Sequence, residues 1–353
     1  MSGTGRCRDP RRPAQSEGSA PRTSPRTEGS AWRAGVTGTR ASTAWTSTTW
    51  SRGEGPLVVL LHGFPHLWFS WRHQIGPIAG AGYRVVAPDM RGMGGTSGPR
   101  DHREYDVDRI VGDLTGLLDH LGETKAVFSG LDFGLFAAYD LAHHHPERVA
   151  AIIGLENPFF TPSRESPRTL AARQATRHFN HIHYFNAPGV ADRELAAAPR
   201  EFLRKLFYAL SSDYHYLDVW RQPPGTSYID ALPETPPLPW TWLTETELEF
   251  YVDAYSRSGF TGGLNWYRAM DLSWEYRKSY GDRKNPVPFY FIGSEQDTDL
   301  EGWHGPDPLS RLEDHHADVR GVRMIKEAGH MMQMEKHAET TAAMLEFLAG
   351  GGR

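Results

Sequence analysis

The stretch Gly130-Leu131-Asp132-Phe133-Gly134 decides how this chain is interpreted. It follows the apolar run at residues 126–128 and precedes residues 135–139, which have helical character. A strand, a tight turn flanked by glycines and a helix form a nucleophile elbow, which presents one reactive side chain at the edge of a sheet. A serine usually occupies the centre of this elbow, but here the central residue is Asp132. A carboxylate can displace a leaving group from an sp³ carbon, and the resulting ester can later be cleaved by water.

The composition restricts the classes of protein that this chain can belong to. With 353 residues it can bury the core of one large α/β domain with an inserted subdomain. A net charge of −5 gives no reason to expect nucleic acid or a membrane surface as a partner. No apolar run approaches the roughly 18 residues of a membrane-spanning helix. The single cysteine, Cys7, excludes an internal disulfide and predicts a reducing, cytoplasmic compartment.

Residues 1–52 differ from the rest of the chain. They are rich in Arg, Ser, Thr, Gly and Pro and lack a periodic apolar pattern, which predicts a disordered leader. The alternative is a misread frame, because residues 41–51 lack the alternation expected of a strand. A frame shift would restore alternating apolar and polar residues there, and resequencing the locus would test this.

From residue 53 onward, strand and helix patterns alternate, which predicts a mostly parallel, doubly wound sheet. Between residues 159 and 280 the strand-like runs disappear, and aromatic-rich helical segments broken by Pro and Gly replace them. We therefore predict an α/β core at residues 53–158 and 281–353 and an inserted helical cap at residues 159–280. The expected strands lie at residues 57–61, 83–87, 126–128, 150–155, 287–293 and 322–325.

A nucleophile at an elbow needs a general base and an acid that orients the base. Their order along the chain in this kind of fold is nucleophile, acid, histidine. Asp297 follows the strand that ends near Gly293 and is the predicted acid, with Asp299 as the alternative. His330 follows the last expected strand and is the predicted base.

An oxyanion hole in this position uses two backbone N–H groups. One belongs to Phe133, the residue after the nucleophile. The other is expected from Phe64, in the loop His62-Gly63-Phe64-Pro65 after the first central strand.

These motifs resemble those of the epoxide hydrolases of the α/β-hydrolase superfamily, of the soluble type, from about residue 53 to the end. The motif around His330, residues 329–334, and two cap motifs at residues 184–191 and 265–268 carry the resemblance further. It implies an α/β-hydrolase fold with a helical cap, a small-molecule epoxide as partner, and no metal or organic cofactor. It also implies that the hydroxyls of Tyr184 and Tyr267 face the nucleophile.

The sequence departs from the family pattern on both sides of the nucleophile. Leu131 stands where the family usually has a histidine, and Phe133 stands where it usually has a tryptophan. The backbone N–H of Phe133 is unaffected, so these changes concern the shape of the pocket and the preferred substrate.

The resemblance implies a two-step reaction. Asp132 attacks an epoxide carbon while Tyr184 and Tyr267 hold and protonate the oxygen; His330, oriented by Asp297, then activates a water that cleaves the ester to a vicinal diol.

Two alternatives remain open at this point. A haloalkane or haloacid dehalogenase would use the same Asp-His-Asp set, but it needs donors for the departing halide, such as a tryptophan N–H. Phe133 and the paired cap tyrosines disfavour it. A catalytically inactive, ligand-binding member of the fold is the second alternative.

Overall fold

The computed structural model describes residues 1, 3, 33–36, 39–40, 43–44, 48–160 and 163–350. The chain divides into two compact units, Met1–Ala31 and Trp32–Arg353, and only Met1 and Gly3 of the first unit are described. Most of the predicted leader, residues 1–52, therefore lies outside the described residues. The sheet and the helices belong to the second unit.

Eight strands of the described residues form one sheet in the order β1-β4-β6-β5-β7-β8-β9-β10. All neighbours from β6 to β10 run parallel, whereas β4 pairs antiparallel with β6 and β1 pairs antiparallel with β4. The predicted mostly parallel sheet is confirmed. The strands are β1 Arg33–Val36, β4 Thr48–Arg52, β5 Leu57–Leu61, β6 Arg84–Pro88, β7 Ala126–Gly130, β8 Val149–Leu155, β9 Asn285–Ser294 and β10 His316–Ile325, with β2 Thr39–Arg40 and β3 Thr43–Ala44 forming a separate pair.

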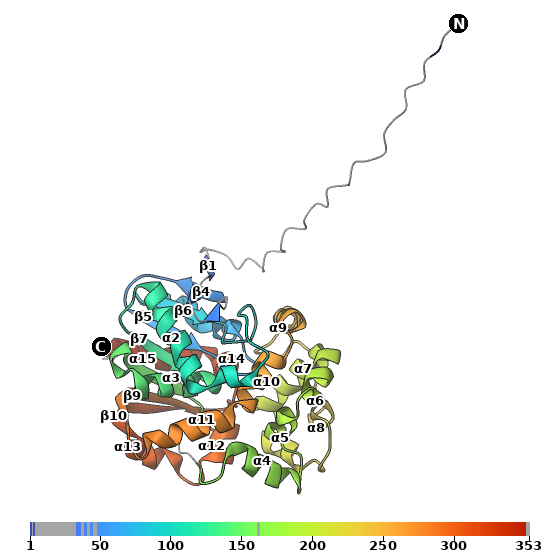
Figure 1. Cartoon of the computed structure of the whole chain (residues 1–353). Helices are drawn as coiled ribbons and strands as arrows, with labels where there is room; N and C mark the ends of the chain where they lie inside the picture. The colour runs from blue at the N-terminus through green and yellow to red at the C-terminus, as the bar shows by residue number, and fades with distance from the viewer. Residues whose placement is uncertain are drawn as a thin grey trace. The chain divides into compact units, whose positions relative to one another are not determined.

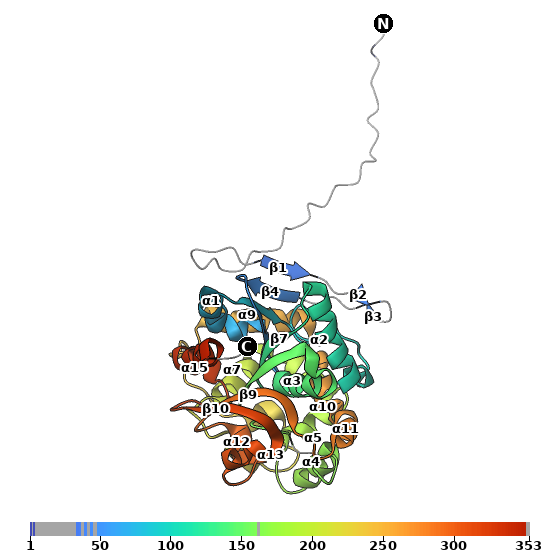
Figure 2. The ribbon, with the colours of Figure 1, turned by 90° about the vertical axis from the view of Figure 1, so that its left-hand side faces the viewer.

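The central strands are apolar throughout because helices cover both faces of the sheet. In β5, Val59 and Leu61 join one core cluster, whereas Val58 and Leu60 join the other, as the alternation of side chains along a strand requires. Helices α1 and α15 lie on one side of the sheet and α2 and α3 on the other (Figure 2). The core helices are α1 Arg72–Gly80, α2 Val107–Leu121, α3 Phe133–His144, α12 Thr298–Trp303, α13 Leu312–His315, α14 Met332–Glu335 and α15 His337–Gly350, with 3-10 helices η1 Trp68–Trp71, η2 His102–Tyr105, η3 Pro146–Arg148 and η6 Pro308–Arg311.

The sheet begins earlier than the sequence predicted. We expected order from about residue 53, but β4 occupies Thr48–Arg52 and pairs with β6, and β1 pairs with β4. Strand β4 lies between β1 and β6, and its Trp50 stacks on Trp68 with ring centroids 4.2 Å apart. The misread frame stays a prediction, because residues 41–42 and 45–47 lie outside the described residues.

The helical insert lies between β8 and β9, as predicted, and its helices gather at one side of the sheet (Figure 1). No helix within the described residues is long and apolar enough to span a membrane. The limits of residues 159 and 280 for the cap stay a prediction. The insert contains α4 Pro167–Ala175, α5 His181–Asn186, α6 Val190–Ala197, α7 Pro199–Leu210, η4 Tyr216–Arg221, α8 Tyr228–Ala231, α9 Glu245–Ser258, α10 Thr261–Arg268, α11 Met270–Arg277 and η5 Lys278–Tyr280.

Candidate active site

Asp132 lies at a sharp turn between β7 and α3, with φ 48° and ψ −131°. A non-glycine residue in this conformation is strained and is held by its surroundings. The turn also needs close packing, because a Cβ atom on Gly134 would lie 2.5 Å from the carbonyl oxygen of Leu61 in β5. The elbow predicted from residues 130–134 is therefore the turn that aims the Asp132 side chain.

The two predicted oxyanion donors both act on the Asp132 carboxylate. The backbone N–H of Phe64 donates to Oδ1 at 2.8 Å. Burial raises the pKa of Asp132 to about 6, while the charge of His330 and the backbone N–H of Phe133 oppose that rise. The carboxylate is thus buried, hydrogen-bonded and able to ionise near neutral pH.

His330 and Asp297 form a hydrogen-bonded pair beside this carboxylate. The Nδ1–H of His330 donates to Oδ2 of Asp297 at 2.9 Å, and both side chains are buried. The other oxygen of Asp297 accepts the backbone N–H groups of Asp299 and Leu300, each at 2.9 Å. Asp297 is therefore the carboxylate that is hydrogen-bonded to Nδ1 of His330.

Asp299, the alternative acid, has other partners. Its carboxylate accepts a hydrogen bond from the Asn157 side chain at 2.6 Å and another from the Trp303 indole at 3.1 Å. These contacts hold it toward the wall of the cavity, so the geometry favours Asp297 over Asp299 as the partner of His330.

Glu156 is a residue of the site that sequence reasoning missed. Its Oε2 accepts the backbone N–H of Asp132 at 2.9 Å and lies 3.3 Å from Nε2 of His330. Glu156 is fully buried, has a positive φ of 74°, and no hydrogen-bond donor among the described residues contacts its Oε1. It follows β8 directly, and the carboxyl ends of parallel strands are where ligand sites form. An acidic residue right after a buried strand run was the available signal.

The electrostatics of this cluster couple its members. Burial lowers the pKa of His330, but the nearby carboxylates of Glu156 and Asp297 outweigh this and raise it well above the usual value. Burial raises the pKa of Glu156 well above its usual range, and the positive charge of His330 opposes the rise. The two shifts are coupled, because Nε2 of His330 lies 3.3 Å from Oε2 of Glu156.

The turn that carries His330 is fixed by one further carboxylate. Glu335 accepts the backbone N–H groups on both sides of the histidine, from Gly329 at 3.1 Å and Met331 at 3.2 Å. The hydroxyl of Ser294, at the end of β9, donates to the carbonyl oxygen of Gly329 at 2.8 Å. The histidine thus sits on a rigid turn.

A cavity of about 350 Å³ lies between the cap and the core, and Asp132 is one of its lining residues. Its walls are mostly apolar and come from α2 and α3 on one side and from α4, α5, α10 and α11 on the other. A smaller space of about 50 Å³ is bordered by both Asp132 and His330. Tyr267 of α10 borders both spaces.

Tyr267 lies where the sequence motif predicted. It borders the cavity with Asp132, its ring packs edge-on against Phe133 with centroids 4.8 Å apart, and no described residue forms a hydrogen bond with its hydroxyl. Burial raises its pKa well above the usual value, so the hydroxyl stays protonated. Tyr267 therefore borders the same space as Asp132 with a protonated phenol.

Helix α10, which carries Tyr267, rests directly on the loop after β6. A Cβ atom on Gly262 would lie 1.9 Å from the carbonyl oxygen of Gly92, so only glycine permits this approach. The indole of Trp266 donates to the carbonyl oxygen of Arg91 at 3.0 Å.

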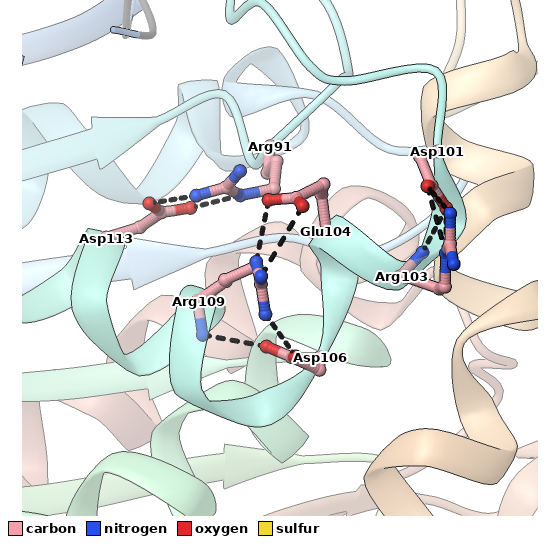
Figure 3. Close-up of polar contacts among 7 residues, drawn as sticks. All are labelled: Arg91, Asp101, Arg103, Glu104, Asp106, Arg109 and Asp113. Atoms are coloured by element: carbon pink, nitrogen blue, oxygen red, sulfur yellow. Dashed lines mark hydrogen bonds and ion pairs between the residues drawn. The ribbon is translucent and has the colours of Figure 1, made fainter. Parts of the chain in front are cut away.

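Arg91 is itself anchored by the ion pairs drawn in Figure 3. Its guanidinium contacts both oxygens of Asp113 in α2, at 2.7 and 2.5 Å. Nearby, Arg109 contacts Glu104 at 2.7 Å and Asp106 at 2.5 Å, which ties η2 to the start of α2. Bidentate pairs of this kind fix orientation, and here they fix the loop on which α10 rests.

Tyr184 does not lie at the cavity. Its hydroxyl donates to Oε2 of Glu194 at 2.6 Å, and the other oxygen of Glu194 accepts the backbone N–H of Ile229. The expectation that Tyr184 faces the nucleophile is therefore corrected. Its side chain instead connects α5 to Glu194 of α6, and Glu194 in turn connects α6 to α8.

The sequence matches the family model described as the alpha/beta hydrolase fold over residues 56–337. Epoxide hydrolase A of Mycobacterium tuberculosis is 39% identical over 298 residues, which cover 84% of this chain and 91% of that protein. A crystal structure of epoxide hydrolase A from Mycobacterium thermoresistibile is 39% identical, with a TM-score of 0.82 over 90% of this chain and 99% of that one. An epoxide hydrolase from an endophytic Streptomyces is 31% identical, with a TM-score of 0.84 over 90% of this chain and 96% of that one.

Proposed function

Because the chain belongs to the epoxide hydrolases of the α/β-hydrolase superfamily, we propose that it converts an epoxide to a vicinal diol through an ester on Asp132. One observation carries this proposal. A buried carboxylate, held by the N–H of Phe64 at 2.8 Å, shares a cavity with the hydroxyl of Tyr267.

The first step forms the ester. A carboxylate oxygen of Asp132 attacks an epoxide carbon, the C–O bond breaks, and its electron pair moves to the departing oxygen. The phenol of Tyr267 supports this step, because it can bind the developing alkoxide and give it a proton. Burial favours the reaction by removing water that would otherwise solvate the carboxylate.

The second step cleaves the ester. The space of about 50 Å³ bordered by Asp132 and His330 is large enough for a water molecule. His330 takes a proton from this water, the water attacks the ester carbonyl, and the N–H groups of Phe64 and Phe133 stabilise the oxyanion. The bond from the carbonyl carbon to the alkyl oxygen then breaks, and His330 returns its proton to that oxygen, which releases the diol and leaves Asp132 as a carboxylic acid. Asp297 and Glu156 support this step because their charges stabilise the imidazolium that forms.

The tryptophans of the cavity disfavour a dehalogenase. A halide leaving group needs free N–H donors, but the indoles bordering the two spaces have protein acceptors. These indole hydrogen bonds run from Trp266 to Arg91, from Trp274 to Ser163, from Trp303 to Asp299 and from Trp220 to His181.

The lining of the larger cavity supports a lipophilic substrate. Phe136, Phe159 and Met270 are among its walls, and Asp132 and the Asp140–Arg277 ion pair are among its polar groups. A pocket of this kind recognises an apolar body and orients it by few polar contacts. We therefore propose that the substrate is an epoxide with an aryl or alkyl substituent. We also propose that the enzyme uses no metal or organic cofactor. The cytoplasmic location remains a prediction that rests on the single Cys7.

Trapping the ester tests the proposal. Removing the base in His330→Gln should leave alkylation intact and stop hydrolysis, so intact mass after mixing with styrene oxide should increase by one whole epoxide. The double variant Asp132→Asn/His330→Gln is the matched control and should show no adduct. If the His330→Gln protein is folded, forms no adduct and still produces diol, Asp132 is not the nucleophile.

A further inference from the structure

Opening an epoxide leaves an alkoxide that needs strong hydrogen-bond donors, and the cap provides one in Tyr267. Tyr184 is committed to Glu194 and does not border the cavity. The residue of α5 that does border both the large and the small space, together with Asp132 and Tyr267, is His181.

His181 is the first residue of α5 and lies one helical turn before Tyr184. Its ring is perpendicular to that of Tyr267, with centroids 6.0 Å apart and an interplanar angle of 89°. On its other sides the imidazole is parallel to the rings of Trp220 and Tyr228, with centroids 6.0 and 6.2 Å away. This aromatic packing fixes the plane of the imidazole beside the phenol.

The hydrogen bonds of His181 define which nitrogen carries the proton. The indole N–H of Trp220 donates to Nδ1 at 3.3 Å, and the hydroxyl of Tyr216 lies 3.4 Å from the same nitrogen. An indole N–H can only donate, so Nδ1 must be the acceptor. A neutral imidazole with an accepting Nδ1 carries its proton on Nε2, and no described residue forms a hydrogen bond with that nitrogen.

We propose that His181 is the second catalytic donor of the cap, and that its Nε2–H binds the epoxide oxygen beside the hydroxyl of Tyr267. This assignment rests on the proposed function, because it concerns the step in which Asp132 opens the epoxide. The cap would therefore use a histidine–tyrosine pair rather than two tyrosines.

The two donors have different roles in the step that opens the epoxide. As Asp132 forms the new C–O bond, the electron pair of the broken bond moves to the oxygen, which receives hydrogen bonds from both groups. The phenol of Tyr267 gives up its proton and becomes a phenolate, because a neutral imidazole is the weaker acid. His181 keeps its proton and shares the negative charge. After ester hydrolysis, the proton released by the regenerated Asp132 carboxylic acid restores the phenol.

The protonation state of His181 agrees with this role. Burial lowers its pKa to about 4, with the charge of Asp299 opposing the decrease and that of His330 adding to it. Other titratable groups facing its ring are Tyr216 and Tyr228, whose pKa values burial raises. The imidazole is therefore a neutral donor at the pH of catalysis.

Single-turnover kinetics with styrene oxide in the His330→Gln background test the assignment, because the ester then accumulates and its formation is the only step observed. Adding His181→Phe should slow ester formation by about 10- to 100-fold. His181→Gln, which keeps a neutral N–H donor, should recover part of the loss. His183→Phe, on the exposed side of the same helix, and Tyr184→Phe should react within about twofold of the background.

A second measurement does not depend on activity. Imidazole nitrogen NMR at pH 7, with the signals of His181 assigned by their loss in His181→Gln, should show the neutral form protonated on Nε2. Ester formation at the background rate in His181→Phe, or a His181 proton on Nδ1, would overturn the assignment. If the His330→Gln background itself forms no ester, the proposed function fails instead.

Discussion

The two halves of the site are held in different ways. On the sheet, the Asp132 carboxylate is held by a backbone N–H of the loop after β5, that of Asp297 by N–H groups of the first turn of α12, and His330 sits on a turn held by Glu335. In the cap, His181 and Tyr267 are fixed by ring packing between short helices. Main-chain atoms hold the sheet half in place, whereas side-chain rings hold the cap half, whose position relative to the cavity follows from which side of each helix faces it.

This difference predicts that loss of the nucleophile on the sheet is nearly total in its effect and that the loss of one donor in the cap is partial. The largest effect is expected for Asp132→Ala, which removes the nucleophile and should lower kcat by at least about 10⁴-fold. Steady-state diol formation measures the loss. Thermal unfolding of the variant serves as control, and a folded variant that retains a tenth of the activity would contradict the role of the sheet half.

The next effect concerns the cap alone. Tyr267→Phe should slow ester formation by about 10- to 100-fold, because one of two donors to the oxygen is lost. Hydrolysis of an ester already formed should be unchanged, since that step uses His330. Rapid-mixing tryptophan fluorescence can separate the two rates, and slower hydrolysis with normal ester formation would reverse the assignment of the halves.

A substitution of Glu156 tests how a carboxylate of the sheet half changes the pKa of His330. Glu156→Gln keeps an acceptor for the backbone N–H of Asp132 but removes a charge that raises the pKa of His330. The pKa of His330 should fall, so the acid limb of ester hydrolysis should move to lower pH. The plateau rate should fall by about tenfold, because a weaker base activates water less well. An acid limb that stays in place would exclude an electrostatic role for Glu156.

The pH dependence of ester formation follows from burial of the nucleophile. The pKa of Asp132 is raised to about 6, and only the ionised carboxylate attacks. The rate of ester formation should be constant above that pH and should fall as the pH drops below it. In His330→Gln the limb should move to higher pH, because the charge that lowers the pKa of Asp132 is gone. A limb that moves the other way would contradict this coupling.

The smallest effect is expected for Tyr184→Phe. Its hydroxyl supports Glu194 rather than the reaction, so the variant should lose about 1 kcal/mol of stability and little activity. Urea unfolding measures the first quantity and single-turnover kinetics the second.

The same difference explains what could be predicted from the sequence. Chain order and strand ends were enough to find Asp132, Asp297 and His330 as neighbours, because parallel strands bring their carboxyl ends to one edge. The cap motif led to Tyr184 rather than His181, because two residues one helical turn apart share a face of α5, and the sequence alone does not say which of them borders the cavity. Residue type alone pointed to Tyr184, whereas the way α5 lies against the cavity makes His181 the residue that borders it.

Glu156 and β4 were missed for other physical reasons. Glu156 needs a positive φ to turn its carboxylate under the elbow, and no pattern of residue types signals that conformation. Strand β4 carries little alternation in its sequence, but its backbone pairs with β1 on one side and with β6 on the other.

The central claim is that Asp132 forms the covalent ester and that water attacks its carbonyl carbon. A single turnover of the wild-type enzyme in water labelled with heavy oxygen tests it most directly, with the Asp132 peptide and the diol both analysed by mass spectrometry. Heavy oxygen is expected in the Asp132 carboxylate and none is expected in the diol of that first turnover. Heavy oxygen in the diol with an unlabelled Asp132 would mean direct attack of water on the epoxide, and would contradict the account.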